Sequence, residues 1–251
     1  MERVLMFDEI IVFNHHIKKT FCFYKICVVS NVLKDSDYST QYCLQILDLS
    51  RNRLREITSH DLVKYSGLSI LYLTDNIITE ISDDSLDDKS YLHTLDISVN
   101  PFHKIPSILF HLPALKSLRM GRIKSEHIVI DIEDAKPITS PLTYLDLSHN
   151  KLNRLPDLGL LPTLLYYNVT GNTHVKMNIT NFAGLCNLEQ FINQDFTADF
   201  EDPCECWKTE MWLKERKVNF TSFQCGVQGM NILGRIYLTC VLNVLTLKAK
   251  F

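Results

Sequence analysis

One eleven-residue pattern recurs along this chain and constrains its fold more than any other feature. The pattern reads L-x-x-L-x-L-x-x-N-x-L, and it occurs as LQILDLSRNRL at 44–54, LSILYLTDNII at 68–78 and LHTLDISVNPF at 92–102. The three starts, at residues 44, 68 and 92, are 24 residues apart each time. Equal spacing of three matches is typical of a repeat protein, in which each unit packs mainly on its neighbours.

The pattern continues with less regular copies after residue 102. They begin at residues 115, 142, 164 and 188, so the chain holds about seven repeats. Ile123 and Phe196 replace the asparagine in two of them, and we expect the turns there to be less regular. The unit that starts at 115 also carries a charged insertion, GRIKSEHIVIDIEDAKPITSP, which predicts a longer loop on the outer side of the array.

Each fixed position of the pattern has a physical role. The L-x-L pair places two apolar side chains on one face of a short strand, pointing into the core. The asparagine turns the chain off the strand, and its amide can satisfy backbone groups of that turn and of a neighbouring repeat. The pattern is similar to that of leucine-rich repeat proteins. This resemblance implies an α/β solenoid or horseshoe with a parallel concave β-sheet.

The cysteines lie mostly at the two ends of the chain. We divide the chain into an N-terminal flank (1–43), the repeats (44–196) and a cysteine-rich C-terminal region (197–251). One disulfide bond is expected among Cys22, Cys27 and Cys43. Clustering at the ends is typical of caps stabilised by disulfide bonds in an oxidising compartment. Asp8 and Glu9 interrupt the start where a signal peptide would be apolar, so the compartment is inferred from the cysteines alone.

The C-terminal region carries a second, more specific resemblance. It contains Pro203-Cys204-Glu205-Cys206, then Trp212-Leu213, then Cys225 and Cys240. This arrangement resembles the cysteine-rich C-terminal cap of extracellular leucine-rich repeat proteins, a group that includes Toll-like receptors and Slit-like and other insect cell-surface proteins. The resemblance implies the disulfide bonds Cys204–Cys225 and Cys206–Cys240. Four thiolates could also hold zinc, but the C-x-C spacing is tighter than usual for a zinc site.

The cap also predicts a short amphipathic helix over 207–217. We expect Trp207, Met211 and Trp212 to cover the last repeat, with Glu210 among the residues left in water. Cys186, inside a repeat, is expected to be buried.

Composition and motifs argue against several classes of function. A net charge of −3 gives no nucleic-acid footprint, and no apolar run reaches the roughly 18 residues of a membrane helix. The chain lacks the nucleophile elbow, phosphate loop, zinc-protease and dinucleotide motifs. We therefore expect no enzyme, no cofactor and no metal site.

Function is expected on the concave surface, where strand residues between the core positions face solvent. Aromatic, arginine, histidine and acidic side chains there are candidates for partner binding. The candidates are Tyr72, His93, Asp96, Arg119, Arg122, Tyr144, His149 and Tyr166. Glycosylation sequons occur at Asn168, Asn178 and Asn219. A glycan on Asn168 would cover the C-terminal part of the concave face.

The function favoured by these observations is non-catalytic recognition outside the cell. The ligand would be a protein, or a cell-surface or microbial molecule, bound by a secreted protein or by part of a receptor involved in immunity or adhesion. The alternative is a cytosolic leucine-rich repeat scaffold or regulatory subunit with reduced cysteines.

Overall fold

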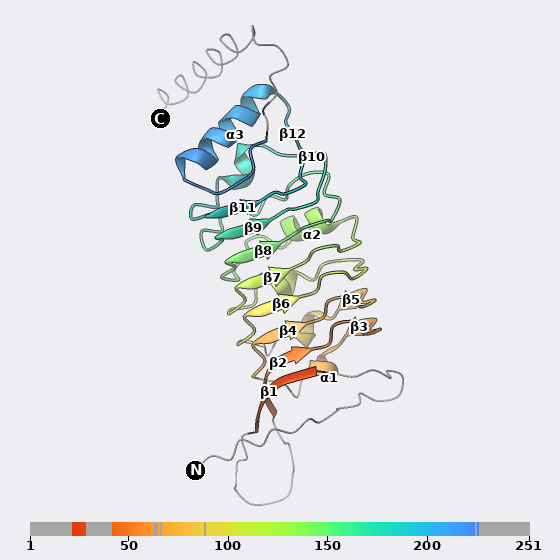
Figure 1. The fold of residues 1–251 in the computed structure, drawn as a ribbon. Coiled ribbons are helices and arrows are strands. Elements are labelled where there is room, and N and C mark those ends of the chain that lie inside the picture. The colour runs from red at the N-terminus through yellow and green to blue at the C-terminus, as the bar shows by residue number, and fades with distance from the viewer. Residues whose placement is uncertain are drawn as a thin grey trace, which may run out of the picture.

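The computed structural model describes residues 22–28, 42–62, 65, 67–87, 89–223 and 225. Its main sheet has eight strands in the order β1-β2-β4-β6-β7-β8-β9-β11 (Figure 1). Seven of them are parallel, one from each predicted repeat: β2 (Tyr42–Asp48), β4 (Ile70–Tyr72), β6 (Thr94–Asp96), β7 (Ser117–Arg119), β8 (Tyr144–Asp146), β9 (Tyr166–Asn168) and β11 (Gln190–Ile192). The predicted solenoid of seven repeats with a parallel sheet is confirmed.

The eighth strand, β1 (Cys22–Val28), pairs antiparallel with β2 and precedes the first repeat. The register sets Cys27 opposite Cys43 and Cys22 opposite Asp48. Of the three N-terminal cysteines, Cys27 and Cys43 are therefore the pair that the backbone brings together.

The core is built around one inward-facing residue of each strand, which is the middle residue in every strand except the longer β2. Neighbouring strands align these residues in register, so that each one packs on its counterpart in the next repeat. In order they are Leu47, Leu71, Leu95, Leu118, Leu145, Tyr167 and Phe191, none more than 1% exposed. Because each repeat contributes apolar side chains at the same positions, the core is continuous along the array.

Every repeat turns off its strand through a residue in the left-handed backbone region. These residues have φ between 47° and 70°, and they occupy the eighth position of the pattern: Arg51, Asp75, Val99, Arg122, His149, Gly171 and Asp195. The turn at Arg122 is as regular as the others, since its backbone N donates to the Ser148 carbonyl at 2.8 Å. The expectation that Ile123 would disturb its turn is wrong; Ile123 is buried, and the ladder of backbone hydrogen bonds holds the turn. The turn before Phe196 likewise keeps its left-handed residue, Asp195.

A column of buried asparagines connects successive turns. The Asn100 amide donates to the carbonyls of Ile97 in its own repeat and Leu73 in the preceding one, at 2.9 and 3.0 Å. Its oxygen accepts a hydrogen bond from the Ile78 backbone N at 3.0 Å. The other asparagines that reach back in this way are Asn76, Asn150 and Asn172. The partner repeat is thus the preceding one.

The outer arc is made of short elements. They are β3 (Glu56–Ile57), α1 (Ser59–Leu62), β5 (Glu80–Ile81), η1 (Asp83–Ser85), η2 (Ser107–Phe110), β10 (Val175–Lys176), η3 (Ile179–Phe182) and β12 (Ala198–Asp199). The short 3-10 helix η2, between Pro106 and Pro113, agrees with the expectation that these prolines exclude a long helix.

The charged insertion forms a helix, α2 (Ile128–Asp134), where we expected a loop. The helix forms because Ile128 and Ile132, four residues apart, share the face that is buried in the core. Asp131, also buried, accepts a hydrogen bond from the Ile105 backbone N at 2.9 Å. Insertion and array are therefore joined by both apolar and polar contacts.

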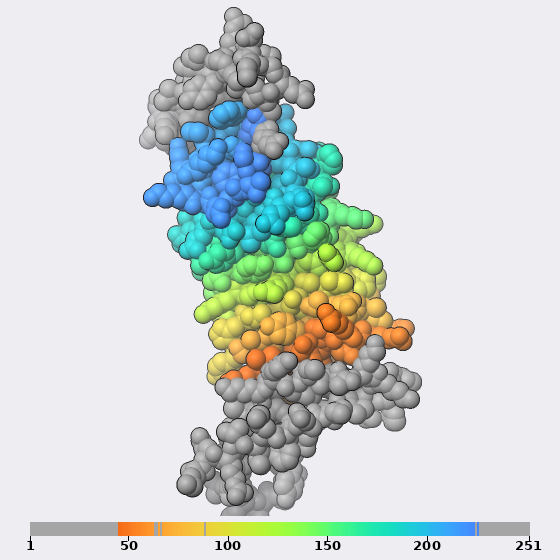
Figure 2. All heavy atoms as spheres, viewed as in Figure 1, coloured from red at the N-terminus to blue at the C-terminus, as the bar shows by residue number. Residues whose placement is uncertain are grey.

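The C-terminal helix α3 (Pro203–Glu215) covers the last repeat (Figures 1 and 2). Its buried face consists of Cys206, Thr209, Glu210 and Leu213, which follow the helical spacing of three and four residues. Two expectations were wrong: Met211 is 46% exposed, and Glu210 is buried. The Glu210 carboxylate accepts hydrogen bonds from the Ser222 hydroxyl and from the Phe223 backbone N, and it pairs with Lys214 at 2.9 Å.

The disulfide bonds of the cap differ from those that the resemblance implied. Cys206 is bonded to Cys225, so neither Cys204–Cys225 nor Cys206–Cys240 forms. Residues two apart on a helix point in nearly opposite directions, and it is Cys206 that lies on the buried face. Cys204 is also disulfide-bonded, and Cys240 lies outside the described residues. Cys186 is an exposed free thiol, because the buried position is taken by its neighbour Leu185.

Candidate functional site

Five of the predicted binding residues share the concave face of the sheet. Tyr72, Asp96 and Arg119 occupy the third position of successive strands and lie in register. Tyr144 and Tyr166 occupy the first position of β8 and β9 and are also in register. Parallel strands lie about 4.8 Å apart, so these side chains form one surface.

The centre of this surface is a contact between Arg119 and Tyr144. The guanidinium carbon of Arg119 lies 5.4 Å from the centre of the Tyr144 ring, which is a cation–π distance. Partial burial, and then the charge of Asp146, raises the pKa of Tyr144, while Arg119 opposes that rise. Arg119 lies in register between Asp96 and Asp146, so acidic residues flank its charge on both sides.

The acidic residues of this column have a structural role. Asp48, Asp96 and Asp146 each accept a hydrogen bond from the backbone N two residues later, at 2.8–2.9 Å. Asn168 does the same with Thr170 at 3.0 Å. The aspartates therefore hold the ends of the strands, and Asp96 has only part of its carboxylate left for a partner.

Two of the predicted residues, His93 and Tyr166, are already engaged by neighbours. The His93 ring nitrogen Nδ1 lies 2.6 Å from the Tyr91 carbonyl oxygen and 3.2 Å from the Ser69 hydroxyl. The Tyr166 hydroxyl donates to the Glu189 carboxylate at 2.9 Å, and this contact raises the pKa of Tyr166. Both side chains are held in a defined orientation, which lowers the entropy cost of binding.

Arg122 and His149 do not lie on the strands. They are the left-handed residues at the turns, three positions beyond β7 and β8, and they form the edge of the concave face. The His149 ring lies over Gly171 of the next repeat, since a Cβ at Gly171 would stand 2.1 Å from the His149 ring nitrogen Nδ1. Gly171, with φ of 70°, thus serves both the turn and the packing of that ring.

Lys124 and Lys151 were missed by the sequence reasoning. They lie two residues after Arg122 and His149, both are exposed, and they share the tenth position of the pattern. The signal was present in the sequence, as R-I-K and H-N-K at equivalent places in successive repeats.

The three sequons lie in different settings. Asn168 is half-buried at the end of β9, between strands on both sides. Asn178 is exposed at the start of η3, where its side chain accepts hydrogen bonds from the backbone N and hydroxyl of Thr180. Asn219 is exposed, and its backbone pairs with that of Gln190 in an isolated parallel β-bridge.

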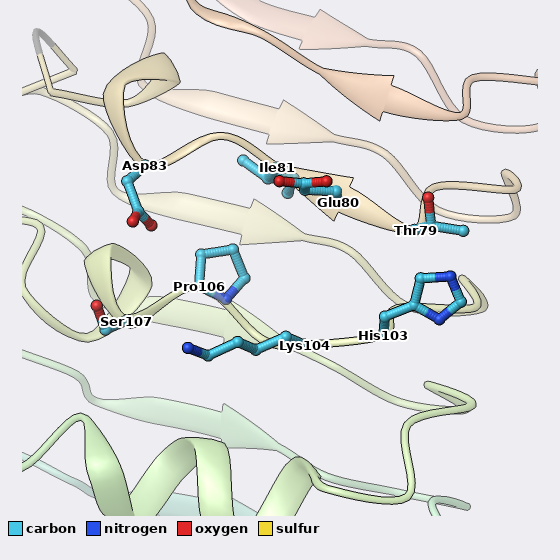
Figure 3. Close-up of a pocket in the computed structure, with 8 residues that line it drawn as sticks. All are labelled: Thr79, Glu80, Ile81, Asp83, His103, Lys104, Pro106 and Ser107. Atoms are coloured by element: carbon cyan, nitrogen blue, oxygen red, sulfur yellow. The ribbon is translucent and has the colours of Figure 1, made fainter.

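A pocket of about 410 Å³ lies on the outer arc, away from the predicted surface (Figure 3). Its walls come from two successive repeats, residues 79–83 and 103–107, and they include Glu80, Asp83, His103 and Lys104. Opposite charges on neighbouring repeats line the same hollow. Nothing in the repeat pattern pointed to it.

The described residues contain no group of three His, Cys, Asp or Glu side chains arranged to hold a metal ion. In the same part of the chain, no helix combines the length and the apolar character needed to cross a membrane.

The comparison with protein families agrees with the repeat geometry. The Leucine Rich Repeat family model matches residues 43–64 and 141–165, which cover the first and fifth strands of the parallel sheet. The chain therefore has the leucine-rich repeat fold. The structure of TLR13 in complex with ssRNA13 shares the fold, with a TM-score of 0.50 and 18% identity over 63% of this chain and 23% of that chain.

Three curated proteins are similar to this leucine-rich repeat chain. Tsukushi of Mus musculus is 28% identical over 171 residues (57% of this chain, 48% of Tsukushi). Toll-like receptor 2 of Equus caballus is 29% identical over 185 residues (65% of this chain, 23% of the receptor). Mimecan of Homo sapiens is 30% identical over 139 residues (52% of this chain, 45% of Mimecan). The chain therefore spans half or less of the length of these relatives.

Proposed function

We propose that this chain is a non-catalytic recognition module that works outside the cell. Its concave face would bind a protein, or a cell-surface or microbial ligand, as part of a receptor or as a secreted protein. Toll-like receptor 2, Tsukushi and Mimecan are similar to more than half of the chain, which supports this class of function over a cytosolic scaffold.

The observation that carries the proposal is the exposed Arg119 and its contact with Tyr144. Arginine and tyrosine are among the side chains that most often anchor protein interfaces. Here they stand on a sheet whose opposite face is fully packed, so the surface is rigid. Tyr72 and Tyr166 extend it over neighbouring repeats.

The Cys206–Cys225 bond supports an oxidising compartment. A cytosolic protein would keep these thiols reduced. Peptide mapping of the protein from its native cells by mass spectrometry should find this bond, together with sugar on at least one sequon. Free thiols and unmodified asparagines would favour the cytosolic alternative.

The net charge does not exclude a nucleic-acid partner. TLR13, which shares the fold, was solved in complex with ssRNA13, so the expectation drawn from a charge of −3 is not supported. The distribution of charge over the surface matters more than the total.

The concave face can be tested by placing a glycan on it. On β4, Tyr72→Asn creates an Asn-Leu-Thr sequon that ends at Thr74. On the outer arc, Asp83→Asn creates an Asn-Asp-Ser sequon that ends at Ser85. If the concave face recognises the partner, the Tyr72→Asn protein loses binding to cells of the native tissue, whereas the Asp83→Asn protein keeps it. Equal binding by two glycosylated, secreted variants would refute the concave site.

A further inference from the structure

A cluster of exposed positive charge lies at the edge of the concave face. It consists of the cations Arg122, Lys124 and Lys151 together with the imidazole of His149, and we call these four residues the basic rim. All four are exposed, and they occupy the eighth and tenth positions of two adjacent repeats. The chain as a whole carries a charge of −3, so this concentration of positive charge is local.

The backbone brings the two halves of the basic rim side by side. The Arg122 backbone N donates to the Ser148 carbonyl at 2.8 Å, immediately before His149 in the next turn. Turns linked in this way repeat at the strand spacing, about 4.8 Å. The rim therefore presents two rows of basic side chains along the axis of the array.

Within the described part of the chain, these basic side chains have no acidic partner. None of the four side chains makes a hydrogen bond or an ion pair there. The basic residues of the nearby outer arc differ: Arg154 forms a two-bond pair with Glu133, and Lys136 lies 2.6 Å from Asp157. Those pairs lower the pKa of both carboxyl groups, as expected for neutralised charges.

Acidic residues lie on both sides of the rim along the array, but they do not pair with its side chains. Asp75 occupies the eighth position two repeats before Arg122, and Val99 separates them. Asp195 occupies that position two repeats after His149, beyond Gly171. Asp146 is held by the Ser148 backbone N, and Glu126 is exposed two residues after Lys124.

We propose that the basic rim binds a linear sulfated polysaccharide of the heparin class. Three unpaired cations and one histidine, set in two rows on an open edge, fit a chain with regularly spaced anionic groups. Single-stranded RNA fits less well, because such sites stack bases on exposed aromatic rings. The only aromatic ring among the four rim residues is that of His149, which lies over Gly171. On the concave face, Arg119 lies over the ring of Tyr144.

This inference deepens the proposed function, since it names a partner class for an extracellular surface next to the concave face. It can fail independently, because the glycan on Tyr72→Asn tests cell binding and the basic rim is tested with a purified polysaccharide. Loss of one activity leaves the other measurable.

The chain offers a matched control for the basic rim. Arg51 and Arg53 occupy the same eighth and tenth positions of the first repeat, and Arg51 has φ of 56°, against 55° for Arg122. The rim variant is Arg122→Asn with Lys124→Gln, and the control is Arg51→Asn with Arg53→Gln. Asparagine accepts the left-handed conformation, and both variants remove two positive charges.

The full chain, with its disulfide bonds intact, is titrated onto immobilised heparin at several salt concentrations. We expect the affinity to fall with salt, and the rim variant to bind roughly 5- to 30-fold more weakly at about 0.15 M salt. The control should stay within about twofold of the unchanged protein. Thermal unfolding of all three proteins verifies that folding is retained.

Three results would overturn the proposal. Equal loss in the rim and control variants would show that only net charge matters. Absence of heparin binding by the unchanged protein would remove the ligand. Tighter binding of a polyuridine RNA than of heparin, weakened by the same rim variant, would assign the rim to nucleic acid instead. Desulfated heparin, run in parallel, should bind weakly if sulfate is the group recognised.

Discussion

The asparagine column predicts that two chemically identical substitutions differ in cost. Asn76 and Asn100 occupy the same position in successive repeats, and both are buried. We expect Asn100→Ala to destabilise the protein by about 3–5 kcal/mol and Asn76→Ala by only about 1–3 kcal/mol. The difference follows from which backbone groups each substitution leaves without a hydrogen bond.

Removal of the Asn76 amide leaves one backbone group without a hydrogen bond. Leu49 O keeps the hydrogen bond from Asn52, and Leu73 O keeps the one from Asn100. The Leu54 backbone N loses its acceptor, but Leu54 is only partly buried, so water can reach it. One partly buried donor accounts for the smaller cost.

Removal of the Asn100 amide leaves two buried backbone groups without a hydrogen bond. Ile78 N loses its acceptor, and Ile97 O loses its donor. The next repeat cannot replace that donor, because it has Ile123 in place of asparagine. An unsatisfied buried polar group costs about 1–3 kcal/mol, and here there are two.

Equilibrium urea unfolding, followed by circular dichroism with the disulfide bonds intact, measures both free energies. An exposed asparagine, Asn153, provides the control, and its replacement by alanine should change stability by less than about 0.5 kcal/mol. Equal losses for Asn76→Ala and Asn100→Ala, or a larger loss for Asn76→Ala, would refute the reasoning. Adding Ile123→Asn to Asn100→Ala should also show a favourable coupling energy, because a new amide can reach Ile97 O.

Two further predictions concern the C-terminal part of the array. Tyr167 is fully buried and its hydroxyl has no hydrogen-bond partner among the residues that the structure describes. Tyr167→Phe should therefore be neutral or stabilising by up to about 2 kcal/mol in urea unfolding. Burial raises the pKa of Tyr167, so stability of the unchanged protein should fall as pH rises above about 10, where only the unfolded tyrosine ionises; the variant should lack this part of the fall. A stabilising hydrogen bond would instead make Tyr167→Phe less stable.

For Glu210, burial raises the pKa, but hydrogen bonds from Ser222, Lys214 and Phe223 outweigh it and lower the pKa below 4.5. Its contribution is therefore present above pH 4.5 and lost as pH falls through the lowered pKa, so Glu210→Gln should be less stable than the unchanged protein at pH 7 and approach it at pH 3. A stability gap that does not depend on pH would contradict this.

Most of the array was predictable because its information is local and repeated. The spacing of leucines defined seven strands, their inward residues and the parallel sheet, since each repeat packs only on its neighbours and the same answer recurs. The concave positions of Tyr72, Arg119 and Tyr144 followed from strand alternation. Even the two cationic turns were visible as R-I-K and H-N-K.

Other features depended on the tertiary structure, because they are decided by contacts between segments. The left-handed turn at Val99 is a poor local choice for a β-branched residue, and the ladder of hydrogen bonds imposes it. The buried face of α3 is set by what it meets on the last repeat, and so Cys206, not Cys204, reaches Cys225. The sequence by itself determined the period and the core; only the packed chain decided which polar and charged groups are neutralised and which, as at the basic rim, are left for a partner.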